Sequence, residues 1–241
     1  ILRPDISRTL LSKKENLNME FAPDGPKAIP MWINGHAFLT VTDAFFTVTN
    51  PVTGEAIHRV PLCGASEAAE AVGAAQVAQP AWAMMGMPAR RLCLASLGDA
   101  LDRYTGHFAK LLMQDCGFDD ARATAEVGEA VAALRGAAVG ETGVFALILD
   151  ASRPLAGMAE AIAPALMAGA AVVVKPSLKA PSAVYALCEL SGRADWPAGV
   201  LNLMQGDTAA IEGLCAGGID RLVFLGDLVG YGHDREWCCD L

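Results

Sequence analysis

The sequence contains seven cysteines, whose side chains could do several kinds of chemistry. A thiolate can attack a carbonyl carbon, bind a metal ion or form a disulfide. The cysteines are Cys63, Cys93, Cys116, Cys188, Cys215, Cys238 and Cys239. An odd number, placed mostly within apolar helical patterns, favours reduced thiols and a cytoplasmic location. The adjacent pair Cys238 and Cys239 follows His233 at a spacing that matches no common zinc motif, so we expect no metal site.

Histidines and methionines offer two further kinds of site, and neither pattern favours one. His36 and His58 fall in hairpin-like segments and His107 on a helix surface, where solvated or locally bonded imidazoles are the ordinary case. Three methionines and a tryptophan within residues 82–87 are interpreted as packing between helices rather than as a cofactor site.

The second half of the chain alternates apolar runs with helical patterns. The apolar runs cover residues 143–149, 170–174, 200–204 and 222–225, and the helical segments between them cover 154–168, 180–190 and 208–215. Strands that are apolar throughout and alternate with helices form parallel sheets covered on both faces. We therefore predict an α/β fold in which about residues 143–226 form a Rossmann-like parallel sheet with flanking helices and right-handed crossovers. Ligands of such a sheet bind at the carboxyl ends of its strands.

The beginning of the chain predicts an arm followed by β-hairpins. Residues 1–30 carry scattered charges and no sustained period, and are interpreted as an N-terminal arm. Residues 31–62 are rich in Thr, Val and Phe and contain the turn signals Asn34-Gly35 and Thr53-Gly54. Such alternation of β-formers and turn residues is typical of short hairpins.

A helical region is predicted over about residues 66–135. Its first helix is capped by Ser66 and runs to about Gln79, a second covers about residues 89–113, and a third begins near Asp119. Residues 227–241 are interpreted as a divergent tail.

Charge and hydropathy exclude two classes of partner. The chain has 18 Lys and Arg against 27 Asp and Glu, for a net charge of −9 at pH 7. Its averaged field repels phosphate backbones, so nucleic acid is not an expected partner. The longest uncharged apolar stretch, residues 161–174, is shorter than the roughly 20 residues of a bilayer span. With 53% hydrophobic residues and a mean hydropathy of +0.35, the sequence predicts a surface that partly meets another chain.

An ordered series of segments resembles the N-terminal half of the aldehyde dehydrogenase superfamily. The series is WINGHAF, NPVTGEAI, ASEAAEAVGAAQVAQPAW and AEVGEAVAALR, followed by APALMAGAAVVVKPS, WPAGVLNLMQGD and DRLVFLG. Together these segments cover about residues 31–226. The resemblance implies the cofactor-domain fold of that family and its reaction, in which an aldehyde is oxidised with NAD or NADP through a cysteine nucleophile and a glutamate base.

The resemblance also implies site residues, and the sequence departs from the family at several of them. The contacts implied for the cofactor are Lys175, Ser177, Gly206 and Gly226. Ser152 holds the position of the family's oxyanion Asn, and we interpret it more readily as the N-cap of a helix beginning near Pro154. Leu178 replaces the family's ribose-binding glutamate. Asp227 stands where backbone amides would face the pyrophosphate, and an aspartate there caps those amides and repels phosphate.

The covalent chemistry implied by the resemblance lies further along the family's sequences than this chain extends. Residues 227–241 are too few to hold the family's nucleophile and base, so we expect both to be absent. The late candidates are Cys215, Glu236, Cys238 and Cys239, and none lies in a matching motif. The segment 135–143 is also too short for the family's extended pair of assembly strands.

Two functions from different classes remain open. The first is a non-catalytic aldehyde dehydrogenase-like scaffold or subunit, which acts through association with a protein partner or a second copy and needs no cofactor. The second is the NAD(P)-binding half of a split or truncated aldehyde dehydrogenase, for which NAD or NADP would be the ligand. A shortened or incomplete sequence is a third explanation for the tail at 227–241.

Overall fold

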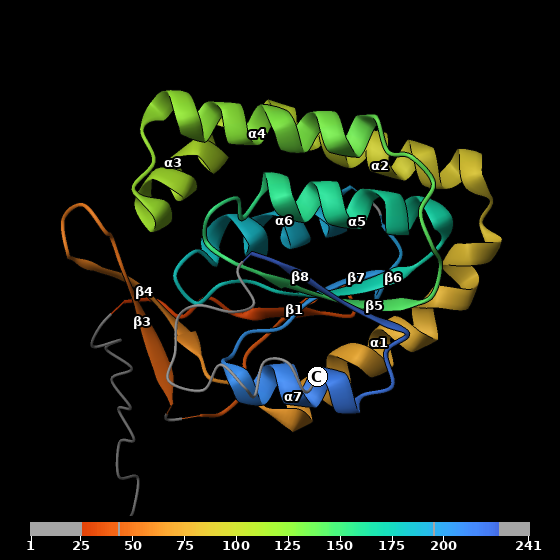
Figure 1. The fold of residues 1–241 in the computed structure, drawn as a ribbon, viewed down its shortest axis with the longest axis horizontal. Helices are drawn as coiled ribbons and strands as arrows, with labels where there is room; N and C mark the ends of the chain where they lie inside the picture. Colours follow the sequence, from red (N-terminus) through yellow and green to blue (C-terminus); the bar gives the residue numbers. More distant parts are fainter. Residues whose placement is uncertain (1–25, 43, 195, 227–241) are drawn as a thin grey trace, which may run out of the picture.

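A computed structural model describes residues 26–42, 44–194 and 196–226 of the chain (Figure 1). The strands are β1 (Met31–Ile33), β2 (His36–Phe38), β3 (Phe45–Thr49), β4 (Ala56–Pro61), β5 (Val144–Leu149), β6 (Ala171–Lys175), β7 (Leu201–Leu203) and β8 (Arg221–Leu225). The helices are α1 (Ala65–Met84), α2 (Met87–Arg103), α3 (Thr105–Cys116), α4 (Asp120–Arg135), α5 (Ala156–Ala168), α6 (Ser182–Arg193) and α7 (Thr208–Ala216). The predicted α/β class is confirmed.

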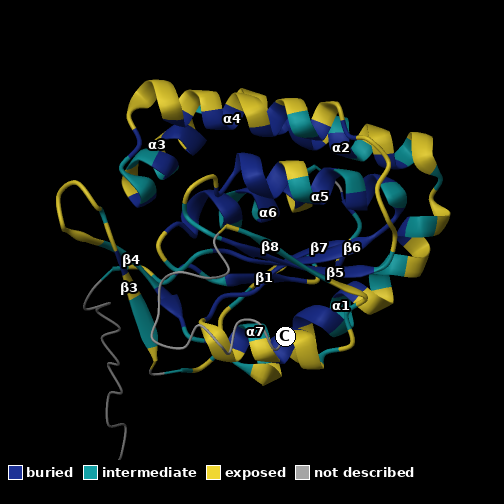
Figure 2. Cartoon of the chain, viewed as in Figure 1, coloured by how far each residue is buried: buried dark blue, intermediate teal, exposed yellow. Residues whose placement is uncertain are grey.

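The centre of the fold is a sheet of order β2-β1-β7-β6-β5-β8, in which β7, β6, β5 and β8 are parallel. Strands β5 and β6 are buried along their whole length, as their unbroken apolar runs predict (Figure 2). Alternate residues enter two cores. Ala146 and Val173 pack on the side of α1 and α7, whereas Leu147 and Val174 pack on the side of α5 and α6. Helices α2 and α4 form an outer layer over α5 and α6 (Figure 1).

The first predicted hairpin joins the central sheet, which the sequence does not indicate. The turn at Asn34 and Gly35 has φ values of 52° and 78°, as a tight hairpin turn requires. Strand β1 also pairs antiparallel with β7, placing Trp32 opposite Leu203. The side chain of Asn202 accepts a hydrogen bond from the Asn34 amide at 2.9 Å. All three residues of β1 are buried, and helices α1 and α6 both contact this strand.

Two helix boundaries differ from those predicted. Helix α1 begins at Ala65 after Gly64, whose amide donates to the Glu67 carboxylate at 3.1 Å, so the prediction of Ser66 as the cap is wrong. The helix predicted over 89–113 is two helices, α2 and α3, with Tyr104 between them at φ −103° and ψ 17°. The start predicted near Asp119 is confirmed, because its carboxylate accepts the Arg122 amide.

The corner between α1 and α2 is fixed by buried polar contacts. Trp82 is 1% exposed, stacks on Trp196 with 5.6 Å between ring centroids, and donates its indole N–H to the Leu166 carbonyl. Arg90 is also buried and donates to the carbonyl of Met167 near the end of α5. Met84, Met85 and Met87, in contrast, are 86%, 40% and 45% exposed, so the interpretation of residues 82–87 as internal packing holds for the tryptophan and is wrong for the methionines.

Several predictions concern the ends of the chain and the connection 136–143. Residues 1–25 of the predicted arm and the tail 227–241 lie outside the described residues. Ile29 is described and donates its amide to the Arg59 carbonyl. Within the described connection 136–143 there is no strand. No helix among the described residues is both long and apolar enough to cross a membrane.

Candidate functional site

The carboxyl ends of β5, β6, β7 and β8 meet at one edge of the sheet, where ligands of such folds bind. Asp150, Gly206 and Gly226 lie just beyond the ends of β5, β7 and β8, and Lys175 is the last residue of β6. Contacts divide this edge into two parts. Asp150 lies against Gly226 on the β5–β8 side, while Lys175 lies within electrostatic range of Asp207 on the β6–β7 side.

Asp150 and Gly226 are packed tightly. The Asp150 amide donates to the Leu225 carbonyl at 3.1 Å, which extends the β5–β8 pairing by one residue. Gly226 has φ 120°, and a Cβ atom there would lie 2.5 Å from the Asp150 carboxylate. Only glycine permits both this backbone conformation and this approach. The carboxylate therefore occupies the space beside the last residue of the described sheet.

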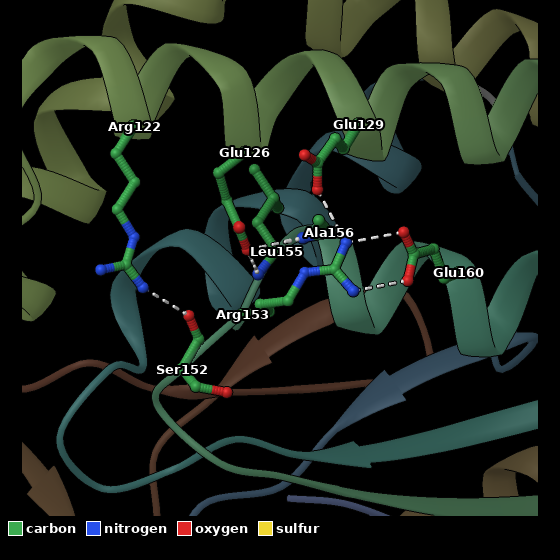
Figure 3. A network of polar contacts seen from close by, with 8 residues as sticks. All are labelled: Arg122, Glu126, Glu129, Ser152, Arg153, Leu155, Ala156 and Glu160. Carbon is green, nitrogen blue, oxygen red and sulfur yellow. Dashed lines mark hydrogen bonds and ion pairs between the residues drawn. The ribbon is translucent and has the colours of Figure 1, made fainter.

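Ser152 turns toward Asp150 and not toward the helix behind it. Its amide and hydroxyl both donate to Asp150 Oδ1, at 2.9 and 2.8 Å. Its carbonyl accepts a hydrogen bond from Arg122 at 3.2 Å (Figure 3). The interpretation of Ser152 as an N-cap is wrong, because α5 begins only at Ala156 and has no side-chain cap from its preceding residue.

The amides at the start of α5 are bound by Glu126 of α4. Its Oε1 accepts from the Leu155 and Ala156 amides at 3.2 and 3.0 Å (Figure 3). Burial raises the pKa of Glu126, and the two amide bonds partly oppose that rise. The sequence analysis missed this residue. A usable signal is its spacing of three after Ala123 and four before Ala130, which places a carboxylate on the apolar face of its helix.

Arg153 forms ion pairs with two carboxylates. It donates to both oxygens of Glu160, at 2.7 and 2.9 Å, and to Glu129 at 2.7 Å (Figure 3). These bonds hold the pKa of Arg153 above its usual value. A cavity of about 370 Å³ opens beside this network, lined among others by Asp150, Ser152, Arg153, Glu160 and Gly226. The charged groups in this lining are the carboxylates of Asp150 and Glu160 and the guanidinium of Arg153, which is already paired with Glu160. The lining therefore offers no unpaired cation for an anionic group.

Lys175 ends β6 with its side chain buried. It is 5% exposed, and its Nζ donates to the Pro176 carbonyl at 3.1 Å. Burial lowers its pKa to about 8, and the charge of Asp207 opposes that shift. In the turn that follows, the Ser177 hydroxyl accepts the Lys179 amide, and Leu178 is half-buried.

Gly206 is fixed by packing at the end of β7. It has φ 135°, and a Cβ atom there would lie 2.7 Å from both the Ala210 side chain and the Cys63 carbonyl oxygen. The preceding Gln205 is fully buried, and its Oε1 has no hydrogen-bond partner among the described residues. Sequence reasoning selected the glycine and missed the glutamine.

The thiols of the described residues are free and mostly poor nucleophiles. Burial raises the pKa of Cys63 and Cys116 to about 12, and also raises the pKa of Cys93 and Cys188. Cys215 is exposed on α7. A raised pKa disfavours the thiolate that attacks carbonyl groups. Glu236, Cys238 and Cys239, like Asp227 and His233, lie outside the described residues. No group of metal-ligating side chains occurs among the residues that are described.

Comparison with known proteins identifies the family of this chain. The sequence profile of the aldehyde dehydrogenase family matches residues 38–142 and 141–228. The chain belongs to the aldehyde dehydrogenase family. The resemblance noted from its ordered segments is thus confirmed.

Individual relatives of this aldehyde dehydrogenase-like chain are enzymes about twice as long. Glutarate-semialdehyde dehydrogenase of Pseudomonas putida is 30% identical over 81% of this chain and 46% of its own length. N-succinylglutamate 5-semialdehyde dehydrogenase of a Caulobacter species is 33% identical over 80% of this chain and 45% of its own. The chain therefore spans about half the length of the curated relatives it matches.

Solved structures confirm the aldehyde dehydrogenase fold. A putative methylmalonate-semialdehyde dehydrogenase from Sinorhizobium meliloti, complexed with NAD, superposes with a TM-score of 0.80 at 24% identity. That match covers 85% of this chain and 47% of the other. An indole-3-acetaldehyde dehydrogenase of P. syringae matches with a TM-score of 0.77 at 25% identity, covering 83% and 46%.

The strand-end residues fit the dinucleotide of this family poorly. Lys175 stands where the resemblance implies a ribose contact, but Leu178 supplies no acceptor beside it. The Asp150 carboxylate lies against Gly226, where the resemblance implies close approach by the pyrophosphate. A fixed carboxylate at that place opposes a phosphate by charge and by volume. Of the implied polar contacts Lys175 and Ser177 are present, whereas Asp150 adds a negative charge where the resemblance implies a phosphate.

Proposed function

We propose that this chain is an aldehyde dehydrogenase-like scaffold or subunit that acts by protein association and does not oxidise aldehydes by itself. The position of Asp150, packed on Gly226 and bonded by Ser152, carries this proposal. The resemblance places Ser152 at the position of the family's oxyanion-binding Asn. Its hydroxyl donates its hydrogen bond to the Asp150 carboxylate. An oxyanion donor must instead point at the substrate oxygen, and the loss of one typically lowers the rate about 10²- to 10³-fold.

The outer strand β8 supports association as the mode of action. Among the described strands, β8 has a neighbour on one side only, which is β5. Its residues Leu222, Val223, Phe224 and Leu225 are apolar and partly exposed. Among the described residues the outer edge of β8 has no strand partner, and an apolar strand edge of this kind can pair with a strand from another chain. A homo-oligomer or a different protein partner would cover this edge in the proposed role.

Titration with NAD and with NADP by calorimetry tests the proposal. We expect a dissociation constant weaker than about 1 mM for the unmodified chain. Replacing Asp150→Asn removes the charge while keeping the shape, and should tighten binding about tenfold if the carboxylate is what excludes the cofactor. Asp99→Asn, in an exposed ion pair with Arg135, is the matched control and should leave binding unchanged.

Three results would contradict parts of the proposed function. Micromolar binding of NAD or NADP to the unmodified chain would contradict the proposal, as would aldehyde oxidation that stops on thiol alkylation. Sedimentation of a stable monomer at micromolar concentration, with no associating protein in native mass measurements, would remove the association role.

Lys175 favours the second candidate, the NAD(P)-binding half of a split or truncated aldehyde dehydrogenase. Among the described residues the buried Lys175 ammonium group has one hydrogen-bond partner, the Pro176 carbonyl, which leaves donors to bond a ribose hydroxyl. This role requires that Lys175→Met abolish a measurable affinity for the dinucleotide. The same calorimetric titration therefore distinguishes the two functions.

A further inference from the structure

A second cavity lies between α3 and α6, apart from the strand-end site. Its volume is about 440 Å³, within the range of small-molecule sites. It is lined chiefly by Tyr104, His107 and Phe108 on one side and by Glu189, Leu190 and Arg193 on the other. The latter residues belong to the last half of α6, which leads back to the start of β7. The cavity therefore lies at the end of the sheet opposite the Lys175 side chain.

The base and wall of this cavity are apolar and aromatic. Phe108 is 2% exposed and Leu190 is 6% exposed, so both are fixed in the core and form the floor of the cavity with little accessible surface of their own. The His107 ring packs edge-on against Phe108, with 5.9 Å between centroids. Tyr104 is 47% exposed beside them. Aromatic rings in this arrangement bind another ring by offset or edge-to-face contact.

The polar rim of the cavity has more donors than acceptors. Arg193 and Glu189 form an ion pair at 2.5 Å through a single nitrogen and a single oxygen. A guanidinium has five N–H donors, so most of those on Arg193 have no partner among the described residues. The Tyr104 hydroxyl adds one further donor, and one oxygen of Glu189 has no hydrogen-bond partner within the described part of the chain. The rim is therefore suited to an acceptor-rich anionic group.

We propose that this cavity binds a small aromatic carboxylate, whose ring lies against the exposed rings of Tyr104 and His107 and whose carboxylate bonds Arg193. A guanidinium and a carboxylate make charge-assisted, often bidentate, hydrogen bonds. The net charge of −9 gives the chain no general attraction for anions, so binding depends on this local arrangement.

The test uses 2-naphthoate as the probe and 2-naphthalenemethanol as its uncharged analogue. We expect saturable calorimetric binding of the carboxylate to the full chain, and at least about tenfold weaker binding of the alcohol. Arg193→Gln should weaken 2-naphthoate about tenfold. Arg221→Gln is the matched control, because Arg221 is an exposed arginine paired with Glu141 elsewhere, and it should bind as the unmodified chain does.

A variant that fills the cavity provides a second, independent test of binding at this site. Ala186 lines the same cavity and is partly exposed on α6, so Ala186→Leu should block the ring while leaving the helix intact. Circular dichroism and thermal melting establish that this variant is folded. The proposal is overturned if 2-naphthoate does not bind at about 5 mM, if the alcohol binds equally well, or if Arg193→Gln binds as tightly as the Arg221→Gln control.

Discussion

Removal of the Glu126 carboxylate tests how the loop after β5 is held. In Glu126→Ala the amides of Leu155 and Ala156 lose their acceptor, and both amides are buried. A hydrogen bond to a charged group contributes about 1.5–3 kcal/mol, and a buried amide left without a partner costs a similar amount. Burial also penalises the carboxylate itself, as its raised pKa indicates, and losing that penalty offsets part of the cost. We expect the free energy of unfolding to fall by about 2–4 kcal/mol.

Urea denaturation at pH 7 measures this change, which should lower the midpoint by about 1 M. Glu126→Gln is the matched variant, since its amide oxygen can accept both hydrogen bonds without a charge, and it should lose less than half as much stability.

The contribution of Glu126 to the free energy of unfolding should also depend on pH, in a direction that its raised pKa determines. A carboxyl whose pKa is raised in the folded state binds its proton more tightly there, so the stability it contributes is present below its unfolded pKa of about 4.5 and is lost as pH rises through the folded pKa.

The unmodified chain should accordingly lose stability relative to Glu126→Gln as pH rises from about 4 to 7. Two results would refute this reasoning. One is a Glu126→Ala variant within about 0.5 kcal/mol of the unmodified chain, which would mean that water replaces the carboxylate at no cost. The other is a difference between the unmodified chain and Glu126→Gln that stays constant, or changes in the opposite direction, across this pH range.

Two further substitutions address the strand-end residues. Lys175→Met should raise the free energy of unfolding at pH 7 by up to about 3 kcal/mol, because a pKa lowered to about 8 makes the charged lysine unfavourable in the fold. The unfolded chain binds the proton more tightly, so the gain should vanish as pH rises from about 8 to 10.5, and a gain independent of pH in urea titrations would contradict the assignment. Gly226→Ala should cost about 2–3 kcal/mol, because φ is 120° and the new Cβ would meet Asp150 at 2.5 Å. Gly73→Ala within α1 meets no atom within 4 Å and should instead gain about 0.5–1 kcal/mol, so equal effects of the two substitutions would disprove the close packing at Gly226.

The fold could be predicted where a local pattern and its tertiary environment agree. The unbroken apolar runs at 143–149 and 170–174 predict buried parallel strands, and β5 and β6 are buried throughout. The acidic start near Asp119 predicts a helix cap, and that carboxylate does accept an amide of its own first turn. The burial of the two strands depends only on the average hydropathy of each run. The Asp119 cap depends on a contact between residues close in sequence.

Predictions failed where a residue distant in sequence supplied the interaction. Ser152 has the residue type of an N-cap, but the amides of α5 are bound by Glu126, about thirty residues earlier. Ser66 is an exception with a local cause, because Glu67, three residues after Gly64, accepts the Gly64 amide in its place. The pairing of β1 with β7 joins segments too far apart for any local signal to show.

By itself, the sequence determined the α/β class, the order of most helices and strands, and the membership in the aldehyde dehydrogenase family, because these follow from hydropathy periods and ordered motifs along the chain. Only the tertiary structure decided that Asp150 packs on Gly226, that Glu126 holds the start of α5, and that a second cavity lies between α3 and α6. Those features depend on the direction of side chains brought together by folding, and residue type alone does not specify that direction.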